Sequence, residues 1–185
     1  MTKIKGASIL ITGGGSGIGA GTAEYLVDQG AKVTICGRRR DKIQQVANSI
    51  GSDCHASHGD ICSEEDRIRI VTESVTHGGG FDALVNNAGN MYRVPLESIE
   101  EGALIDVFHS NVIAPMMMSR LCLPYLAKSK GSIVFLGSIH NRRSFPGVSP
   151  YAATKAAIES VTRSLSAELG VKDIRVNCVA PGAVF

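Results

Sequence analysis

Short apolar runs alternate with longer stretches of helical periodicity along the chain, and this alternation limits the possible folds more than any other property. The runs expected to form strands cover residues 7–12, 32–36, 54–57, 81–85, 132–136 and 174–179. The stretches expected to be helical cover residues 18–29, 41–50, 103–126 and 150–169, and a further one begins at Ser63. Strands that alternate with helices predict βαβ units, and hence a parallel sheet with helices on both faces.

The length and composition fit one such domain. A chain of 185 residues has room for about one domain, which buries roughly 70% of its unfolded surface. The contents of 19% charged and 44% hydrophobic residues exclude a disordered chain. No stretch rich in proline, glycine or serine separates two halves. The sequence therefore predicts a single doubly wound α/β domain of the Rossmann type over residues 1–185.

The charge and the cysteine content exclude several other classes. Nineteen Lys and Arg against seventeen Asp and Glu give a net charge of +2, and there is no tryptophan, so the sequence argues against nucleic-acid binding. The five cysteines are an odd number without a Cys-x-x-Cys pair, which is not a disulfide framework. The sequence has no apolar run of signal-peptide or membrane-spanning length. We therefore expect a reduced, cytoplasmic protein with no membrane or nucleic-acid partner.

A glycine-rich segment, TGGGSGIG at residues 12–19, lies between the first expected strand and the first expected helix. Glycines let the backbone turn tightly and approach a pyrophosphate, while the helix N-terminus offers unpaired N–H groups to the anion. A glycine triplet alone is also compatible with an ordinary tight turn. Its position between a strand and a helix favours a dinucleotide-binding loop.

The end of the second expected strand indicates which dinucleotide binds. Proteins that bind NAD usually place an acidic residue here to accept hydrogen bonds from the ribose hydroxyls. This sequence has Arg38, Arg39 and Arg40 instead, and a guanidinium pairs well with a 2′-phosphate. The pattern predicts NADP(H), with Arg38 as the main phosphate ligand. The alternative is a solvated basic start of the next helix, because Asp41 and Lys42 follow directly.

Three further residues form a candidate catalytic group. Tyr151 and Lys155 are four apart at the start of an expected helix, so they lie one turn apart on the same face. A free tyrosine has a pKa near 10, and a neighbouring ammonium favours the phenolate and brings this pKa toward the working range. Ser138 follows the strand expected at 132–136, at the edge of the sheet where ligands bind.

With these residues the chain resembles the short-chain dehydrogenase/reductase family. The matching motifs appear in family order and are Thr12-Gly13-x-x-x-Gly17-x-Gly19, Asp60, Asn86-Asn87-Ala88-Gly89, Asn111, Ser138, Tyr151-x-x-x-Lys155 and Pro181-Gly182. The resemblance implies an NADP(H)-dependent oxidoreductase that interconverts a secondary alcohol and a carbonyl, such as a 3-oxoacyl reductase. It also implies a homodimer or homotetramer formed through the helices expected at 103–126 and 150–169.

The resemblance also implies a role for each site residue. Tyr151 would be the general acid/base, Ser138 would hydrogen-bond the substrate oxygen, and Lys155 would hold the nicotinamide ribose and lower the tyrosine pKa. Asn111 would position a water in a proton relay, although it could merely cap or kink its helix. Asp60 would contact the adenine, or instead act as a helix cap. The expected cofactor-binding residues are Gly13, Ser16, Gly17, Ile18, Gly19, Arg38, Asp60, Ile61, Asn87, Ala88, Gly89, Tyr151, Lys155, Pro181 and Gly182.

The sequence departs from the family pattern after Pro181-Gly182. Members of this type are usually longer, and the resemblance implies that a threonine following this pair, the C-terminal strand of the sheet and the substrate lid are missing here. The alternative function is therefore a catalytically impaired dinucleotide-binding module. A sugar-nucleotide epimerase shares the loop and the Tyr-x-x-x-Lys pair, but it usually needs a longer C-terminal part.

Two other groups of residues are ambiguous. Cys54, His55, His58 and Cys62 offer four possible zinc ligands, but they fall on the third expected strand, where alternate side chains point to opposite faces, so we expect no metal. His140, with the arginines that follow it, lies in the loop between Ser138 and Tyr151. It is a candidate substrate residue for a polar or anionic compound, and a solvated loop is the equally simple interpretation.

Overall fold

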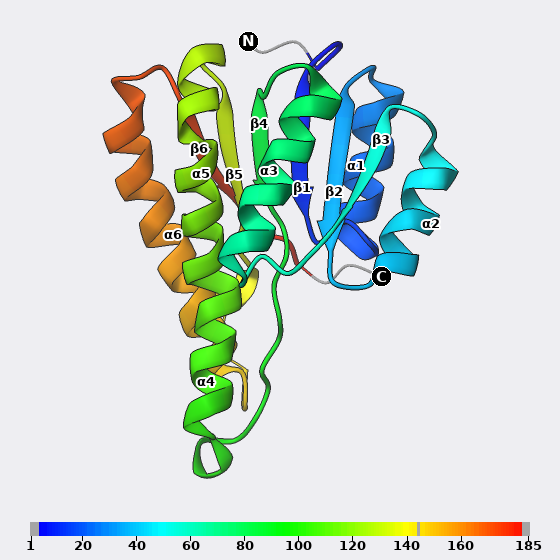
Figure 1. The fold of residues 1–185 in the computed structure, drawn as a ribbon. Coiled ribbons are helices and arrows are strands. Elements are labelled where there is room, and N and C mark those ends of the chain that lie inside the picture. Colours follow the sequence, from blue (N-terminus) through cyan, green and yellow to red (C-terminus); the bar gives the residue numbers. More distant parts are fainter. Residues whose placement is uncertain (1–3, 144, 183–185) are drawn as a thin grey trace.

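The protein is described by a computed structural model over residues 4–143 and 145–182. Within these residues the chain forms one parallel sheet of six strands, in the order β3-β2-β1-β4-β5-β6 (Figure 1). The strands are β1 (Ser8–Thr12), β2 (Lys32–Gly37), β3 (Cys54–His58), β4 (Ala83–Asn86), β5 (Ser132–Leu136) and β6 (Arg175–Val179). The order reverses between β1 and β4, which is the switch point where doubly wound sheets bind ligands. The doubly wound α/β prediction is confirmed.

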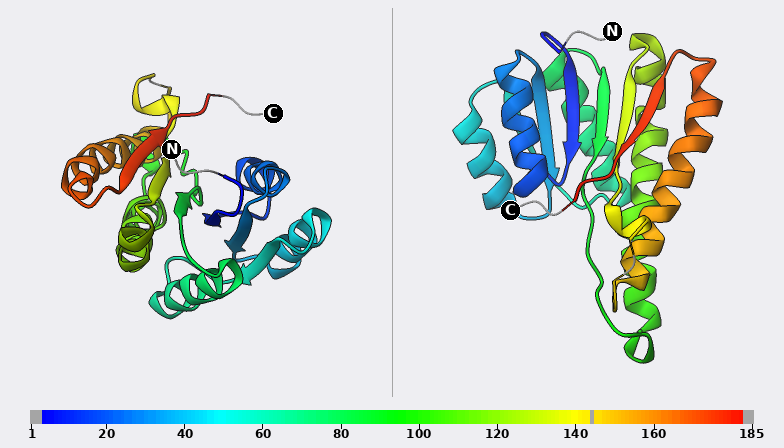
Figure 2. Two further views of the ribbon diagram at one scale, coloured as in Figure 1. Left: turned by 90° about the horizontal axis from the view of Figure 1, so that it is seen from above. Right: turned by 180° about the vertical axis from the view of Figure 1, so that it is seen from behind.

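Helices cover both faces of this sheet (Figure 2). The main helices are α1 (Gly17–Asp28), α2 (Arg40–Ile50), α3 (Glu64–Gly78), α5 (Ala114–Ser129) and α6 (Ser149–Gly170). One apolar cluster packs α3, α5 and α6 against the sheet through residues such as Ile70, Met118 and Ile158. A second cluster packs α1 and α2 against the other face, through Ala23 and Ile43. None of the described helices has the length and apolar character needed to cross a membrane.

The segment expected to be helical over residues 103–126 contains one wider turn. It consists of α4 (Glu101–Phe108), a π-helical turn η2 (His109–Ile113) and α5. The stretch is helical as expected, but hydrophobic spacing does not report a single wider turn within it. Such turns are common at functional sites, and this one contains the candidate site residue Asn111.

The start of α3 follows its sequence signals closely. Ser63 is its N-cap, and the serine side chain accepts a hydrogen bond from the Asp66 backbone N–H at 3.3 Å. Three acidic residues in the first turn interact favourably with the positive end of the helix dipole. The cap leaves Asp60 free for another role in the turn between β3 and α3.

Candidate active site

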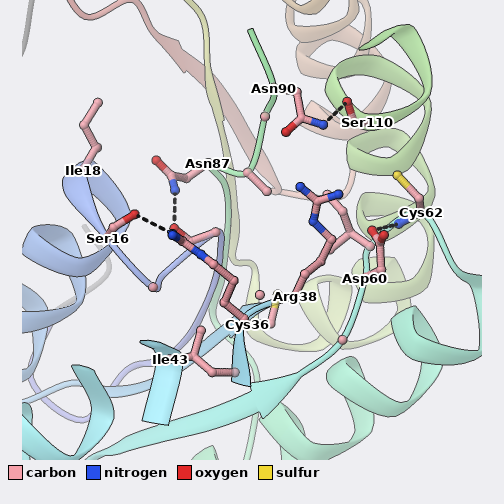
Figure 3. Close-up of a pocket in the computed structure, with 18 residues that line it drawn as sticks. Ser16, Ile18, Cys36, Arg38, Ile43, Asp60, Cys62, Asn87, Asn90 and Ser110 are labelled. Atoms are coloured by element: carbon pink, nitrogen blue, oxygen red, sulfur yellow. Dashed lines mark hydrogen bonds between the residues drawn. The ribbon is translucent and has the colours of Figure 1, made fainter. Parts of the chain in front are cut away.

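Two adjoining cavities lie where the strands of the sheet end. The larger has a volume of about 430 Å³ and is lined by the glycine loop, the end of β2 and the turn after β3 (Figure 3). The smaller, of about 270 Å³, is lined by Ser138, Tyr151 and Lys155 among others. Both cavities share Ile18, Asn87, Gly89 and Asn90, so together they form one continuous groove.

Most residues expected at the site line this groove. The larger cavity contains Gly13, Ser16, Ile18, Arg38, Asp60, Ile61, Asn87, Ala88 and Gly89, and the smaller adds Ser138, Tyr151, Lys155, Pro181 and Gly182. Gly17, Gly19, Asn111 and His140 are not part of its lining. The first three of these nonetheless adjoin it through their neighbours in the chain or through hydrogen bonds, and His140 contacts Ser138 directly.

The glycine loop is held in place by residues that directly follow β4. The Asn87 side-chain amide donates hydrogen bonds to the carbonyl oxygens of Thr12 and Gly13, at 2.9 and 3.1 Å. The Thr12 hydroxyl oxygen accepts hydrogen bonds from the backbone N–H groups of Asn87 and Ala88. The Asn87 side chain therefore connects the segment after β4 to the end of β1. The sequence alone did not indicate this role.

The backbone of this loop passes where a side chain would not fit. Gly13 has a φ of +71°, and a Cβ there would lie 2.8 Å from the Ala88 Cα atom. A Cβ on Gly19 would lie 2.6 Å from the Asn87 amide nitrogen. The N-cap of α1 is Ser16, and its side chain makes no capping hydrogen bond. Close-packed backbone and uncapped N–H groups at the groove fit the pyrophosphate of a dinucleotide.

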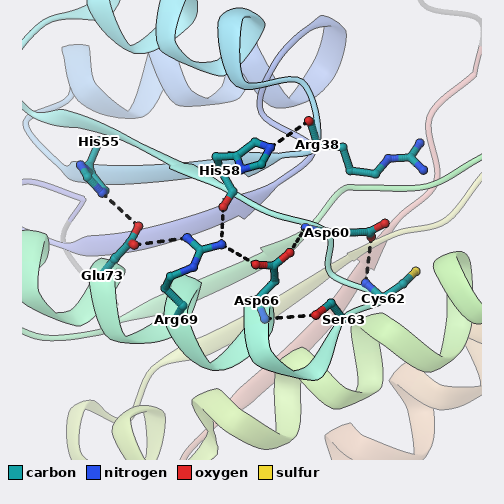
Figure 4. A network of polar contacts seen from close by, with 9 residues as sticks. All are labelled: Arg38, His55, His58, Asp60, Cys62, Ser63, Asp66, Arg69 and Glu73. Carbon is teal, nitrogen blue, oxygen red and sulfur yellow. Dashed lines mark hydrogen bonds and ion pairs between the residues drawn. The ribbon is translucent and has the colours of Figure 1, made fainter.

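The far wall of the larger cavity is the turn from Asp60 to Cys62. The Asp60 carboxylate accepts a hydrogen bond from the Cys62 backbone N–H at 2.9 Å, and the Asp60 N–H donates to the Asp66 carboxylate at 2.8 Å. Arg69 in turn binds the other oxygen of Asp66 and the His58 carbonyl oxygen (Figure 4). The hydrogen bond from the Asp60 N–H and the Arg69 guanidinium lower the pKa of Asp66. This network fixes the turn.

The basic run places two of its three arginines at the groove. All three arginines are exposed, but Arg38 and Arg39 line the larger cavity, whereas Arg40 starts α2 outside this lining. Arg39 donates a hydrogen bond to the Ser16 hydroxyl at 3.3 Å. Figure 3 shows the Arg38 side chain extending into the cavity on the side of Asp60. Both guanidinium groups are thus placed to meet a ligand in this part of the groove.

The smaller cavity brings together the candidate catalytic residues. Lys155 is 5% exposed, and its ammonium lies 5.6 Å from the centre of the Tyr151 ring. It donates a hydrogen bond to the Leu136 carbonyl oxygen at 2.6 Å. Burial lowers the pKa of Lys155 from its usual value. Ser138 lies two residues beyond the end of β5, as expected from the sequence.

Asn111 lies behind this cavity, in the π-helical turn. Its amide nitrogen donates to the Asn90 carbonyl oxygen at 2.8 Å and to the Thr154 hydroxyl at 3.1 Å. Its amide oxygen accepts from the Asn90 N–H at 2.7 Å. Asn111 therefore joins the turn η2, the strand-end segment at Asn90 and helix α6. Within the described residues these contacts connect it to the groove wall rather than to Lys155 itself.

Several groove residues were not expected from the sequence, and Arg39 was expected only as a weaker candidate than Arg38. Arg39, Cys62, Asn90 and Ser110 line the larger cavity. The arginine run was the only signal for Arg39, and nothing in the local sequence marks the others. Burial raises the pKa of Cys62 to about 11, so at neutral pH its thiol is uncharged.

The four residues weighed as zinc ligands have other environments. His55 pairs with Glu73 at 3.4 Å, and the His58 ring lies 3.1 Å from the Arg38 carbonyl oxygen. Cys54 is buried, and Cys62 faces the groove. Among residues 4–143 and 145–182, no group of three or more His, Cys, Asp or Glu side chains is arranged to hold a metal ion.

Comparison with known proteins decides the family. A family model described as short chain dehydrogenase matches residues 7–185. The chain belongs to the short-chain dehydrogenase/reductase family. This short-chain dehydrogenase/reductase is 35% identical to a glucose 1-dehydrogenase of Gluconobacter oxydans, over 98% of this chain and 71% of that protein. It is 31% identical to a bovine (Bos taurus) L-fucose dehydrogenase, over 100% of this chain and 68% of that one.

A solved structure shows the same fold for a family member with a bound dinucleotide. The 3-ketoacyl-(acyl-carrier-protein) reductase from Brucella melitensis, complexed with NADH, matches with a TM-score of 0.95 and 33% identity. The match covers 97% of this chain and 77% of that one. Together with the groove, this likeness supports a nicotinamide dinucleotide as the cofactor of this short-chain dehydrogenase/reductase.

Proposed function

We propose that this protein is an NADP(H)-dependent oxidoreductase that interconverts a secondary alcohol and a carbonyl. The observation that carries the proposal is that Ser138, Tyr151 and Lys155 line one cavity that adjoins the dinucleotide groove. When bound, the nicotinamide supplies or accepts the hydride. The residues of this chain orient the substrate and handle the proton.

Tyr151 is the proposed general acid/base. During reduction its hydroxyl gives a proton to the oxygen of the former carbonyl, and during oxidation its phenolate takes that proton from the alcohol. The Lys155 ammonium lies 5.6 Å from the centre of the Tyr151 ring. An ammonium has three N–H donors, and within the described residues the structure assigns one of them, to the Leu136 carbonyl oxygen. The others are available to hydroxyl groups in the groove.

The preference for NADP(H) rests on Arg38 and Arg39. Both line the larger cavity, and no acidic residue follows β2 before α2 begins. A 2′-phosphate is an anion that a guanidinium binds through charge-assisted hydrogen bonds. Arg39 already reaches the Ser16 hydroxyl at the glycine loop, so the two arginines flank the space between that loop and the Asp60 turn.

The activity is tested with a panel of carbonyl compounds, followed by NADPH absorbance. The panel includes 3-oxoacyl thioesters and sugar lactones, because the relatives include a ketoacyl reductase and a glucose dehydrogenase. Tyr151→Phe should reduce turnover by about 10²–10⁴-fold, as removal of a positioned acid does. NADPH affinity should change little. Tyr25→Phe, at an exposed tyrosine of α1, is the matched control.

Two outcomes would refute parts of this proposal. Near-normal turnover by Tyr151→Phe would exclude the tyrosine mechanism. Tight NADPH binding without turnover of any panel compound would instead support the alternative, a dinucleotide-binding module with impaired catalysis.

Cofactor choice is tested by dissociation constants for NADPH and NADH. Each hydrogen bond to a charged group contributes about 1.5–3 kcal/mol. Arg38→Ala should therefore raise the NADPH dissociation constant roughly tenfold or more and leave that of NADH almost unchanged. Arg40→Ala, at the exposed third arginine, is the control. Equal affinities for NADPH and NADH in the unmutated chain would refute the NADP(H) assignment.

A further inference from the structure

The Ser138 hydroxyl is held by the residue two positions after it. Its oxygen accepts a hydrogen bond from the His140 backbone N–H at 3.2 Å, and the His140 Nδ1 atom lies 3.0 Å from the same oxygen. Ser138 is the N-cap of the short 3₁₀ helix η3 (Ile139–Asn141), in an extended conformation. The side chain of His140 is therefore a direct partner of the proposed substrate-binding hydroxyl.

The His140 ring is itself fixed by aromatic neighbours. It packs against the Phe145 ring with 5.0 Å between ring centres. Its edge meets the Tyr151 ring at a centre distance of 5.8 Å and an angle of 79°. His140 thus contacts both Ser138 and Tyr151 without lining the cavity in which these two residues meet a substrate.

A hydroxyl has a single proton, so this contact determines whether Ser138 can donate a hydrogen bond to a substrate. A serine hydroxyl has one proton to donate and two lone pairs that accept. The His140 backbone N–H occupies one lone pair of Ser138. If Ser138 donated its proton to Nδ1, it would have none for a substrate oxygen. If Nδ1 carries the proton and donates it, both lone pairs are filled and the Ser138 proton remains free.

The proposed reaction needs the second arrangement. Negative charge develops on the substrate oxygen in the transition state, and that charge is stabilised by hydrogen-bond donors already in place. The same transition state serves both directions, so Ser138 must donate to this oxygen in reduction and in oxidation alike.

We propose that His140 is a positioning residue whose Nδ1–H donates to the Ser138 hydroxyl oxygen and leaves the Ser138 proton directed at the substrate oxygen. This role rests on the proposed function. It places the histidine outside the substrate contacts and makes its effect depend entirely on Ser138.

A double-mutant cycle tests this dependence. His140→Leu removes the donor, and His140→Asn keeps an N–H donor near the position of Nδ1. The assay is the reduction of ethyl 3-oxobutanoate, or of the panel ketone with the highest turnover, by NADPH. We expect His140→Leu to lower kcat by about tenfold, a fraction of the 10²–10³ typical for losing a whole donor. His140→Asn should stay within about threefold.

In the Ser138→Ala background, His140→Leu should have no further effect on kcat. An equal loss in both backgrounds would show that the ring acts only by packing, and would overturn the proposal. So would an unchanged kcat in His140→Leu alone.

An activity-independent measurement separates this proposal from the function on which it rests. Nitrogen-15 NMR of labelled protein reports which imidazole nitrogen carries the proton, and the His140 signals are those lost in His140→Asn. We expect Nδ1 of His140 to be protonated in the unmutated chain. A proton on Nε2 alone, with Nδ1 as an acceptor, would overturn the proposal even if the enzyme is active. A protonated Nδ1 in a chain that reduces no ketone would support the contact and refute only the function.

Discussion

Replacing Asn87 by alanine should loosen the glycine loop while leaving the proposed proton-transfer residues intact. The Asn87 amide nitrogen donates to the carbonyl oxygens of Thr12 and Gly13, at 2.9 and 3.1 Å. These bonds connect residues that are 75 and 74 positions apart in the chain. Alanine removes both donors and leaves the backbone hydrogen bonds of Asn87 and Ala88 to the Thr12 hydroxyl in place.

The expected loss follows from these two bonds. Each hydrogen bond contributes about 1 kcal/mol net, so the free energy of unfolding should fall by about 2 kcal/mol. For a domain of this size, 1 kcal/mol corresponds to roughly 2–4 °C in Tm, which gives a decrease of about 4–8 °C. The dissociation constant for NADPH should rise as well, because the loop that we propose faces the pyrophosphate is less ordered.

The assay is thermal unfolding of the unliganded protein, followed by circular dichroism. Asn48→Ala is the control, since within the described part of the chain the Asn48 side chain bonds to Gln44 alone, on the exposed face of α2, at 2.9 Å. Surface changes of this kind usually stay within about 0.5 kcal/mol. If Asn87→Ala lowered Tm no more than Asn48→Ala does, the reasoning that the amide ties the loop to β4 would be refuted.

Two further predictions concern Lys155 and the assembly. Burial lowers the pKa of Lys155 below 10.5, so folding with a charged Lys155 carries a free-energy penalty. This penalty is fully present below the lowered pKa and vanishes as pH rises through 10.5. The Tm of Lys155→Met minus that of the unmutated chain should therefore decrease from neutral pH to pH 10.5 in thermal scans, and a constant difference would contradict the burial argument. We also propose a homodimer or larger homo-oligomer through α4, α5 and α6, where Ile105 is 60% exposed and Ala156 lies at the surface. Light scattering at roughly tens of micromolar should show at least a dimer that Ala156→Arg dissociates, and a monomeric unmutated chain would refute the interface.

The sequence predicted the secondary structure correctly where a local pattern, such as an apolar run or a helix cap, was sufficient. The apolar run expected at 132–136 is strand β5, and the run expected at 174–179 is β6, shorter by one residue at its start. Ser63 and the acids after it predicted the start of α3, because capping is an interaction between residues three apart. The stretch at 103–126 is helical as expected, but its spacing did not reveal the wider turn that contains Asn111, whose side chain bonds to Asn90 and Thr154.

The sequence predicted which types of residue lie at the site, but it did not predict the hydrogen bonds between them. The glycine loop, Ser138, Tyr151 and Lys155 were expected from motifs, and the structure brings all of them to one groove. The sequence could not show that Asn87 holds the loop, or that Arg39 reaches Ser16.

The sequence by itself determined the βαβ alternation, the glycine loop and the identity of the groups at the strand ends. These are local properties, because they depend on side chains a few positions apart along one strand or helix. Only the tertiary structure decided the order of the strands, the joining of two cavities into one groove and the hydrogen bond between Ser138 and His140. The first two depend on contacts between segments far apart in the chain. The third is between near neighbours, but its imidazole packs against the Phe145 and Tyr151 rings, and that packing exists only in the folded protein.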